Sequence, residues 1–255
     1  MPEYLIVPTA AALGAALGSF LNVCVYRLPR DLSVVSPPSA CPACGQRIAW
    51  YDNVPIFGWL LLRGRCRRCK APVSVQYPVV EALVAAIWGS MAWHYGMSIE
   101  AIRAAVFLSL LLGIAITDAQ HYIIPDEFTW GGLALGLGLS LFAGGITLGQ
   151  SVLGAAVGFA LLYAVAWVGE MLLKKEAMGG GDIKMLAMVG AFVGWKGALL
   201  TIFGGALVGT IIFVPISLKT KKMVPFGIFL AVGAAVAFLA GEQIYAWYVG
   251  WVFST

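Results

Sequence analysis

The hydrophobic residues of this chain form long runs with few charged residues, without the polar stripe of a soluble helix. Runs that approach about 20 residues are typical of transmembrane helices, because each must cross roughly 30 Å of hydrocarbon. The pattern predicts about eight such helices. They are centred on residues 4–25, 78–96, 101–117, 128–143, 150–173, 183–195, 197–217 and 226–248. The run 183–195 is short, so we expect it to tilt or to enter the bilayer only in part.

Composition agrees with this pattern. Of the 255 residues, 61% are hydrophobic and 11% are charged, and the mean hydropathy is +0.90. The predicted fold class is therefore an all-α polytopic membrane protein. The first run is not expected to be a cleaved signal peptide. No basic residue precedes it, whereas Arg27 and Arg30 follow it, which is the reverse of a signal peptide's charge order.

Basic residues gather on alternate connections between the predicted helices. One side carries Arg27, Arg30, Arg47, Arg63, Arg65, Arg67, Arg68, Lys70, Lys174, Lys175, Lys184, Lys219, Lys221 and Lys222, and the other carries Arg103 and Lys196. The richer side is expected to be cytoplasmic, so both termini face outward. This topology places Asp118, at the inner end of the third helix, level with Asp182, at the inner start of the sixth. The two carboxylates are therefore expected to face one site.

Four of the five cysteines form two Cys-x-x-Cys pairs, Cys41 with Cys44 and Cys66 with Cys69. Such pairs favour a closed, tetrahedral and structural zinc site. The residues between them are polar and rich in turns, so zinc would supply folding free energy to a small domain. We predict a first transmembrane helix over residues 1–26, a cytoplasmic zinc domain over 27–77 and a transmembrane catalytic domain over 78–255. Reduced thiols and a redox role are the alternatives.

Asp118 and Asp182 are candidates for acid–base chemistry. Ionisable groups at membrane depth are costly and usually functional, and Gly179-Gly180-Gly181 lets the chain bend just before Asp182. Two neighbouring carboxylates do not readily ionise together. One can then activate water while the other donates a proton, as in aspartic proteases. The alternatives are that both aspartates cap helices or that Asp182 pairs with Lys184. Asp126 is interpreted as the N-cap of the fourth helix.

Glycines four residues apart recur along the hydrophobic runs. The pairs are Gly14/Gly18, Gly132/Gly136, Gly154/Gly158, Gly190/Gly194 and Gly205/Gly209. Small residues at this spacing let helices approach closely. We interpret them as packing positions within the bundle, with dimerisation as the alternative.

Several motifs together resemble those of the bacterial type IV prepilin peptidases, in the same order along almost the whole chain. They are Cys41-Pro42-x-Cys44-Gly45, Trp50-Tyr51-Asp52-Asn53-Val54-Pro55, Gly58-Trp59-Leu60, Arg63-Gly64-Arg65-Cys66-x-x-Cys69, Gln76-Tyr77-Pro78-x-x-Glu81, Asp118, Ile124-Pro125-Asp126 and Gly179-x-Gly181-Asp182-x-Lys184. The resemblance implies a multi-pass aspartic endopeptidase of the bacterial inner membrane. It implies Asp118 and Asp182 as the catalytic pair, supported by Gly179, Gly181 and Lys184.

The resemblance also implies the reaction. Members of this family remove the short basic leader of type IV prepilins and of type II secretion pseudopilins. Bifunctional members then methylate the new N-terminal residue, usually Phe, with S-adenosylmethionine, and the cysteine domain is associated with them. The chain lacks a strand–GxGxxG–helix unit, so no Rossmann-type cofactor site is expected. Trp50, Tyr51, Asp52 and Asn53 are candidates either for cofactor contacts or for the core of the zinc domain.

The expected partners are the prepilin and pseudopilin substrates and the lipid bilayer, and no nucleic acid. Arg65 and Arg67 are expected to contact anionic headgroups or an acidic residue of the substrate. One competing interpretation is a proton- or cation-coupled transporter, but the chain has no second Gly-Gly-Gly-Asp segment to suggest two related halves. Another is an assembly factor that docks through its zinc domain.

Overall fold

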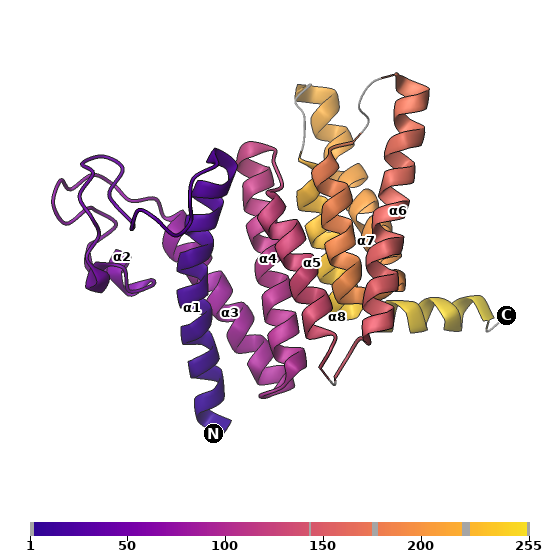
Figure 1. Ribbon diagram of the computed structural model, residues 1–255, viewed down its shortest axis with the longest axis horizontal. Helices are drawn as coiled ribbons and strands as arrows, with labels where there is room; N and C mark the ends of the chain where they lie inside the picture. Colours follow the sequence, from indigo (N-terminus) through magenta and orange to yellow (C-terminus); the bar gives the residue numbers. More distant parts are fainter. Residues whose placement is uncertain (1–2, 143, 175–177, 221–224, 254–255) are drawn as a thin grey trace. The chain divides into compact units, whose positions relative to one another are not determined.

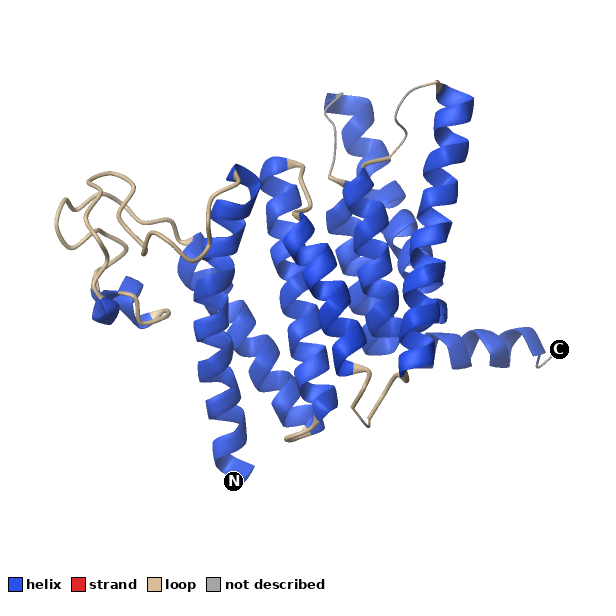
Figure 2. Ribbon diagram, viewed as in Figure 1, coloured by secondary structure: helices blue, strands red, loops and turns tan. Residues whose placement is uncertain are grey.

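The regular elements of this protein are helical (Figures 1 and 2). The computed structural model describes residues 3–142, 144–174, 178–220 and 225–253. The helices are α1 (Glu3–Arg27), α2 (Phe57–Leu61), α3 (Gln76–Tyr95), α4 (Ile99–His121), α5 (Asp126–Leu139), α6 (Leu148–Leu173), α7 (Gly180–Thr220) and α8 (Phe226–Phe253). The all-helical class predicted from the hydrophobic runs is confirmed.

Five of these helices are long and apolar enough to cross a membrane. The segments are Tyr4–Arg30, Ile99–His121, Leu148–Leu173, Gly180–Ile211 and Phe226–Val252. Helix α5 has only 14 residues, fewer than the roughly 20 that a perpendicular span requires, and α3 is not among the five. The prediction of a multi-pass helical protein is therefore confirmed, but the described residues contain five helices of spanning length and composition and not the predicted eight. Lys175, Lys221 and Lys222, which entered the charge count, lie outside the described residues.

The chain reverses direction inside α7. Gly194 has φ 71° and ψ 178°, a conformation that interrupts the helix and favours glycine. The residues before it pack against α6, where Gly158 meets Leu186, and those after it pack against α8, where Gly205 meets Leu230. The predicted helices 183–195 and 197–217 are thus two segments of one element, joined by a sharp bend.

The contacts divide the chain into two units, Met1–Ser109 and Leu110–Thr255. In the first, α1 and α3 pack together, and the loops on either side of α2 carry the cysteines. In the second, the first half of α7 is the most deeply buried helix. Met185, Leu186, Met188 and Val189 are fully buried there, and this half packs against α5 and α6.

The glycine pairs lie where helices of the same chain meet. Gly14 and Gly18 of α1 face α3, and the Gly132/Gly136 pair of α5 faces α7. The tightest approach joins α6 to α7, because a methyl group at Gly154 would lie 2.2 Å from the carbonyl oxygen of Gly190. The interpretation of these pairs as packing positions within the bundle is confirmed.

Gly190→Ala is expected to destabilise the second unit strongly. The added methyl group would lie 2.1 Å from the Gly154 carbonyl oxygen, a backbone atom that a side-chain rotation cannot move. Overpacking of this kind costs about 1–3 kcal/mol, which thermal unfolding in detergent would show as a lower midpoint. Gly149→Ala is the matched control, because nothing lies within 4 Å of that position. Equal midpoints for both variants would contradict the close approach.

Candidate active site

Asp118 lies near the end of α4 and is buried, with 5% of its surface exposed. The backbone N–H of Ile228, in the first turn of α8, donates a hydrogen bond of 3.2 Å to its Oδ2. Gly227 packs so closely that a methyl group there would lie 2.7 Å from the same oxygen. The Asp118 carboxylate is therefore held by the start of α8, a contact that the sequence did not suggest.

Asp182 lies in the first turn of α7, close enough to Asp118 for the two charges to act on each other. Ile124, just after α4, packs against Gly181 at the start of α7 and against Gly227 at the start of α8. The end of one helix and the starts of two others thus meet around the two aspartates. The structure brings together the carboxylates that the topology placed at one level. Their catalytic role stays a prediction.

Lys184 forms an ion pair with Asp126. Its Nζ lies 2.7 Å from Oδ1 and 2.9 Å from Oδ2 of that carboxylate. Two interpretations are therefore wrong. The partner of Lys184 is Asp126 and not Asp182, and the N-cap of α5 is Pro125 and not Asp126. Asp126 is the first residue of the helix, which leaves its side chain free to reach across to α7.

A cavity of about 220 Å³ adjoins the glycine turn that precedes Asp182. Tyr163, Trp167 and Glu170 of α6 line one wall, and Met178 and Gly179 lie on the other. Both Gly179 and Gly180 are exposed, and a side chain at Gly180 would meet nothing within 4 Å. The turn thus leaves backbone accessible beside Asp182.

The four paired cysteines form one cluster. Their Sγ atoms all lie within 4.8 Å of one another. Each pair sits in a similar turn, in which Cys41 O accepts from the N–H of Gly45 and Cys66 O from that of Lys70. The residue four positions after the first cysteine of each pair has a positive φ, 68° at Gly45 and 61° at Lys70. The two Cys-x-x-Cys segments are therefore matching turns that face each other.

The cluster has the chemistry of a structural zinc site. All four thiols are free, and the backbone N–H groups of Cys69 and Arg68 lower the pKa of the Cys66 thiol to about 6. A thiol that ionises readily is a metal ligand, because the thiolate is the form that binds. Four cysteine sulfurs in one cluster suit tetrahedral Zn²⁺ and leave no position open for a substrate.

Of residues 50–53, Tyr51 and Asp52 contact Arg67 within the cysteine domain, whereas Trp50 is exposed. Arg67 donates two hydrogen bonds to Asp52, of 2.7 Å from Nε and 2.6 Å from Nη2, which lower the pKa of that carboxyl. The same guanidinium lies 5.4 Å from the centre of the Tyr51 ring. Arg67 therefore contacts Asp52 and Tyr51 within the domain, while its side chain is 59% exposed, and its contact with headgroups or with an acidic residue of the substrate stays a prediction. Arg65 is exposed.

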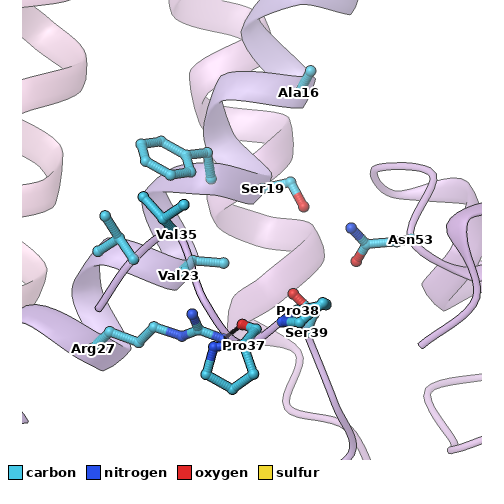
Figure 3. A pocket seen from close by; sticks show the side chains of 11 residues that line it. Ala16, Ser19, Val23, Arg27, Val35, Pro37, Pro38, Ser39 and Asn53 are labelled. Atoms are coloured by element: carbon cyan, nitrogen blue, oxygen red, sulfur yellow. Dashed lines mark hydrogen bonds between the residues drawn. The ribbon is translucent and has the colours of Figure 1, made fainter. Parts of the chain in front are cut away.

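A second cavity, of about 290 Å³, lies between α1 and the loop that leads to the cysteines (Figure 3). Ser19, Phe20 and Val23 form its α1 wall, and Asn53 lines it from the far side of the domain. Arg27 closes one edge, where its guanidinium donates to the carbonyl oxygen of Pro37 at 2.7 Å. Of the four candidates for cofactor contacts, Asn53 is the one that lines this cavity.

The cysteine domain is also tied to α3 by a buried carboxylate. Glu81 is 7% exposed, and its Oε2 accepts a hydrogen bond of 2.6 Å from the N–H of Ile56. Ile56 has φ 64°, an uncommon conformation for a β-branched residue. The bond satisfies a donor at the start of α2. The sequence signal for this contact is Glu81 itself, an acidic residue inside the hydrophobic run 78–96.

Comparison with known proteins identifies the family. Residues 12–95 match the bacterial peptidase A24 N-terminal domain, and residues 105–214 match the type IV leader peptidase family. The prepilin leader peptidase/N-methyltransferase of Pseudomonas putida is 36% identical over 271 residues, which cover 96% of this chain and 94% of that protein. Its Pseudomonas aeruginosa counterpart is 36% identical and covers 91% of this chain and 89% of its own length.

The protein of the same name from Myxococcus xanthus is 38% identical over 213 residues, which are 84% of this chain. There the match spans only 64% of the relative's own length. No solved structure matches the chain. The transporter and assembly-factor interpretations give way to these matches, which follow the motif order along the chain. The chain belongs to the prepilin leader peptidase/N-methyltransferase family.

Proposed function

We propose that Asp118 and Asp182 perform the leader peptidase reaction of this family. The observation that carries the proposal is their meeting in one site, where the end of α4 joins the starts of α7 and α8. Two adjacent carboxylates with one shared proton supply both a base and an acid, so peptide hydrolysis needs neither a metal nor a serine. The substrates are prepilins and type II secretion pseudopilins.

The glycine turn gives the substrate access to Asp182. Peptide hydrolysis requires an extended backbone, and the exposed Gly179 and Gly180 leave room for one beside the carboxylate. Gly181 serves a different purpose, because it packs against Ile124, where a methyl group would lie 3.0 Å from Cβ of that side chain. Gly179, Gly181 and Lys184 thus support the catalytic pair without taking part in the chemistry.

The site would lie at the cytoplasmic boundary of a bacterial inner membrane. Two further helices, α3 and α5, lie beside the five long ones, and α7, which is one of the five, consists of two segments that meet at Gly194. With the two segments of α7 counted separately, the number of spans is the eight that the hydrophobic runs predict. In this arrangement both termini face outward, and Asp118, Asp182 and the cysteine domain face the cytoplasm, where a prepilin's leader meets its hydrophobic segment.

Cys41, Cys44, Cys66 and Cys69 would hold one structural zinc ion. When bound, the ion would join the two cysteine turns of a domain that has little apolar core. Most of its large hydrophobic side chains, including Trp50, Phe57 and Leu61, are exposed. Zinc would therefore supply folding free energy to residues 27–77.

The methyl donor for the second reaction of the family would be S-adenosylmethionine. The cavity beside Asn53 does not fit this molecule as a whole. Its lining residues include no carboxylate for the amino group or the ribose, and the Arg27 guanidinium already donates to the carbonyl oxygens of Ser33 and Pro37. No residue of this cavity is therefore assigned to the methyl donor.

Mass spectrometry of a co-expressed prepilin tests both activities. Loss of the leader and addition of one methyl group change the substrate mass by separate amounts, so each reaction is read independently. We expect both changes in the presence of this protein and neither in its absence. A prepilin that keeps its leader would overturn the peptidase assignment.

The Lys184–Asp126 ion pair is expected to support catalysis by holding α7 against α5. Lys184→Glu would place two acidic side chains together, and we expect leader cleavage to fall about tenfold, the effect of a coupling near 1.4 kcal/mol. Exchanging the charges in the Lys184→Glu, Asp126→Lys double variant should restore most of the rate. A double variant no better than Lys184→Glu alone would show that the pair is not the reason for the loss.

A further inference from the structure

We infer that the two aspartates have different roles, with Asp118 as the general base and Asp182 as the general acid, and that the start of α8 sets this difference. The inference rests on the proposed peptidase function and deepens it. Gly227 and Ile228 are then positioning residues for Asp118. Neither residue was suggested by the sequence motifs.

The first observation is an asymmetry in hydrogen bonding. Asp118 Oδ2 accepts the backbone N–H of Ile228. Among the described residues no hydrogen bond to the Asp182 carboxylate is seen, and the charge that acts on it is that of Asp118. A hydrogen bond from an N–H group is stronger to an ionised acceptor than to a neutral one. Of the two side chains, Asp118 is therefore the one that the fold favours as a carboxylate.

The second observation is steric. The Asp118 carboxylate rests directly on Gly227, where a methyl group would lie 2.7 Å from Oδ2 and 3.1 Å from Cγ. It would also lie 2.9 Å from Cδ1 of Ile124. Glycine is needed at this position because the carboxylate occupies the space of a side chain. Asp118 is held by contact as well as by the hydrogen bond. The Asp182 carboxylate is packed less tightly, because a methyl group at Gly179 would lie 3.6 Å from its Oδ2, an ordinary contact distance.

Helix α8 adds a favourable partial charge. Its first N–H groups have no acceptor within the helix, and they carry the positive end of the helix dipole. The helix has no titratable side chain before Glu242. The charged or titratable side chains at the ends of the other elements that meet near the site are His121, Tyr122, Asp126, Glu127, Asp182 and Lys184, and Glu170 of α6 lines the adjoining cavity.

The reaction then proceeds in two steps, with two proton transfers in each. The Asp118 carboxylate takes a proton from water, whose oxygen bonds to the scissile carbonyl carbon, while Asp182 gives its proton to the carbonyl oxygen. In the second step the Asp118 proton passes to the leaving nitrogen as the C–N bond breaks. Asp182 recovers a proton from the hydroxyl group of the intermediate as the new carboxyl group forms. Both aspartates finish in their starting states.

Gly227→Ala tests the positioning role. Displacement of the Asp118 carboxylate should lower kcat for leader cleavage about 100-fold, with KM changed less than about twofold, because misplacing a catalytic group by about 1 Å costs this much in rate. Gly250→Ala is the matched control on the same helix, since nothing lies within 4 Å of that position. Wild-type kcat in Gly227→Ala would overturn the inference, as would an equal loss in Gly250→Ala.

Ile228→Pro tests the assignment of base and acid. Proline is tolerated in the first turn of a helix and removes the N–H that donates the 3.2 Å hydrogen bond to Asp118, while the neighbouring N–H of Gly227 remains. The acidic limb of the kcat/KM pH profile reports the base and the alkaline limb reports the acid. We expect the acidic limb to move and the alkaline limb to stay. Movement of the alkaline limb alone would reverse the roles, and an unmoved profile would show that α8 does not act on Asp118 ionisation.

Two measurements keep these outcomes interpretable. Thermal unfolding identifies a variant that fails to fold. If Ile228→Pro fails to fold, the pH profile of Gly227→Ala is measured in its place. Cleavage of the prepilin by the wild-type protein under the same conditions distinguishes a failure of the proposed peptidase function from a failure of the proposed role of α8. If the wild-type protein does not cleave, the proposed function fails. If it cleaves but the variants behave like wild type, only the role of α8 fails.

Discussion

Asp118→Asn and Asp182→Asn are each expected to abolish removal of a prepilin leader, with kcat lowered by about 10²–10⁴-fold, the range for loss of a general acid or base. Asparagine keeps the size of the side chain but neither takes nor gives a proton at physiological pH. Because each aspartate depends on the other, the double variant should be little worse than either single variant. Mass spectrometry of the co-expressed prepilin measures the uncut fraction.

Asp31→Asn is the control for this experiment. Asp31 is exposed and has φ 54°, a left-handed conformation that asparagine also adopts readily. This substitution removes a carboxylate without disturbing the fold, so processing should continue at the wild-type rate. Comparable expression of all variants shows that any loss is chemical. If either Asn variant in the pair still processes the prepilin, the two-aspartate proposal is wrong.

Cys41→Ser is expected to release the zinc ion and to unfold the cysteine domain. Elemental analysis of the wild-type protein should give one zinc per chain and analysis of the variant none. Since the binding free energy of such a site is also folding free energy, residues 27–77 should become sensitive to limited proteolysis. A strong chelator should have the same effect on the wild-type protein.

Cys24→Ala provides the comparison for the cysteine variant. Cys24 is buried in α1 and lies outside the four-cysteine cluster. Its substitution should leave the zinc content at one per chain and the cysteine domain resistant to proteolysis. A wild-type protein that is purified without metal and is nevertheless fully folded would contradict the zinc proposal.

The helices were predictable because their cause is local. In a bilayer every backbone N–H and C=O must be satisfied within the segment, so a long hydrophobic run leads directly to a helix. The run 183–195 is short for a membrane span, and the structure gives the reason. It is the first half of α7, which bends at Gly194. The Cys-x-x-Cys spacing is equally local, since each pair forms its own turn.

The pairing of polar side chains was less predictable. The sequence predicts Asp126 as a helix cap, whereas it binds Lys184, and the pairing of Arg67 with Asp52 has no sequence signal. Asp126 and Lys184 are 58 residues apart in the sequence, and Arg67 and Asp52 are 15 apart. Hydropathy and spacing do not report which way a helix is rotated, and that rotation selects the partner.

By itself, the sequence determined the helical class, the cysteine cluster, the motif order and the level at which Asp118 and Asp182 lie, because each follows from hydrophobic length, local spacing or charge along the chain. Only the tertiary structure decided what surrounds Asp118. Ile228 is 110 residues away from it in the sequence, and Gly227 looks like any other glycine of a hydrophobic helix. Their contact with the carboxylate arises because α4, α7 and α8 end or begin at one point, and helix packing sets that point.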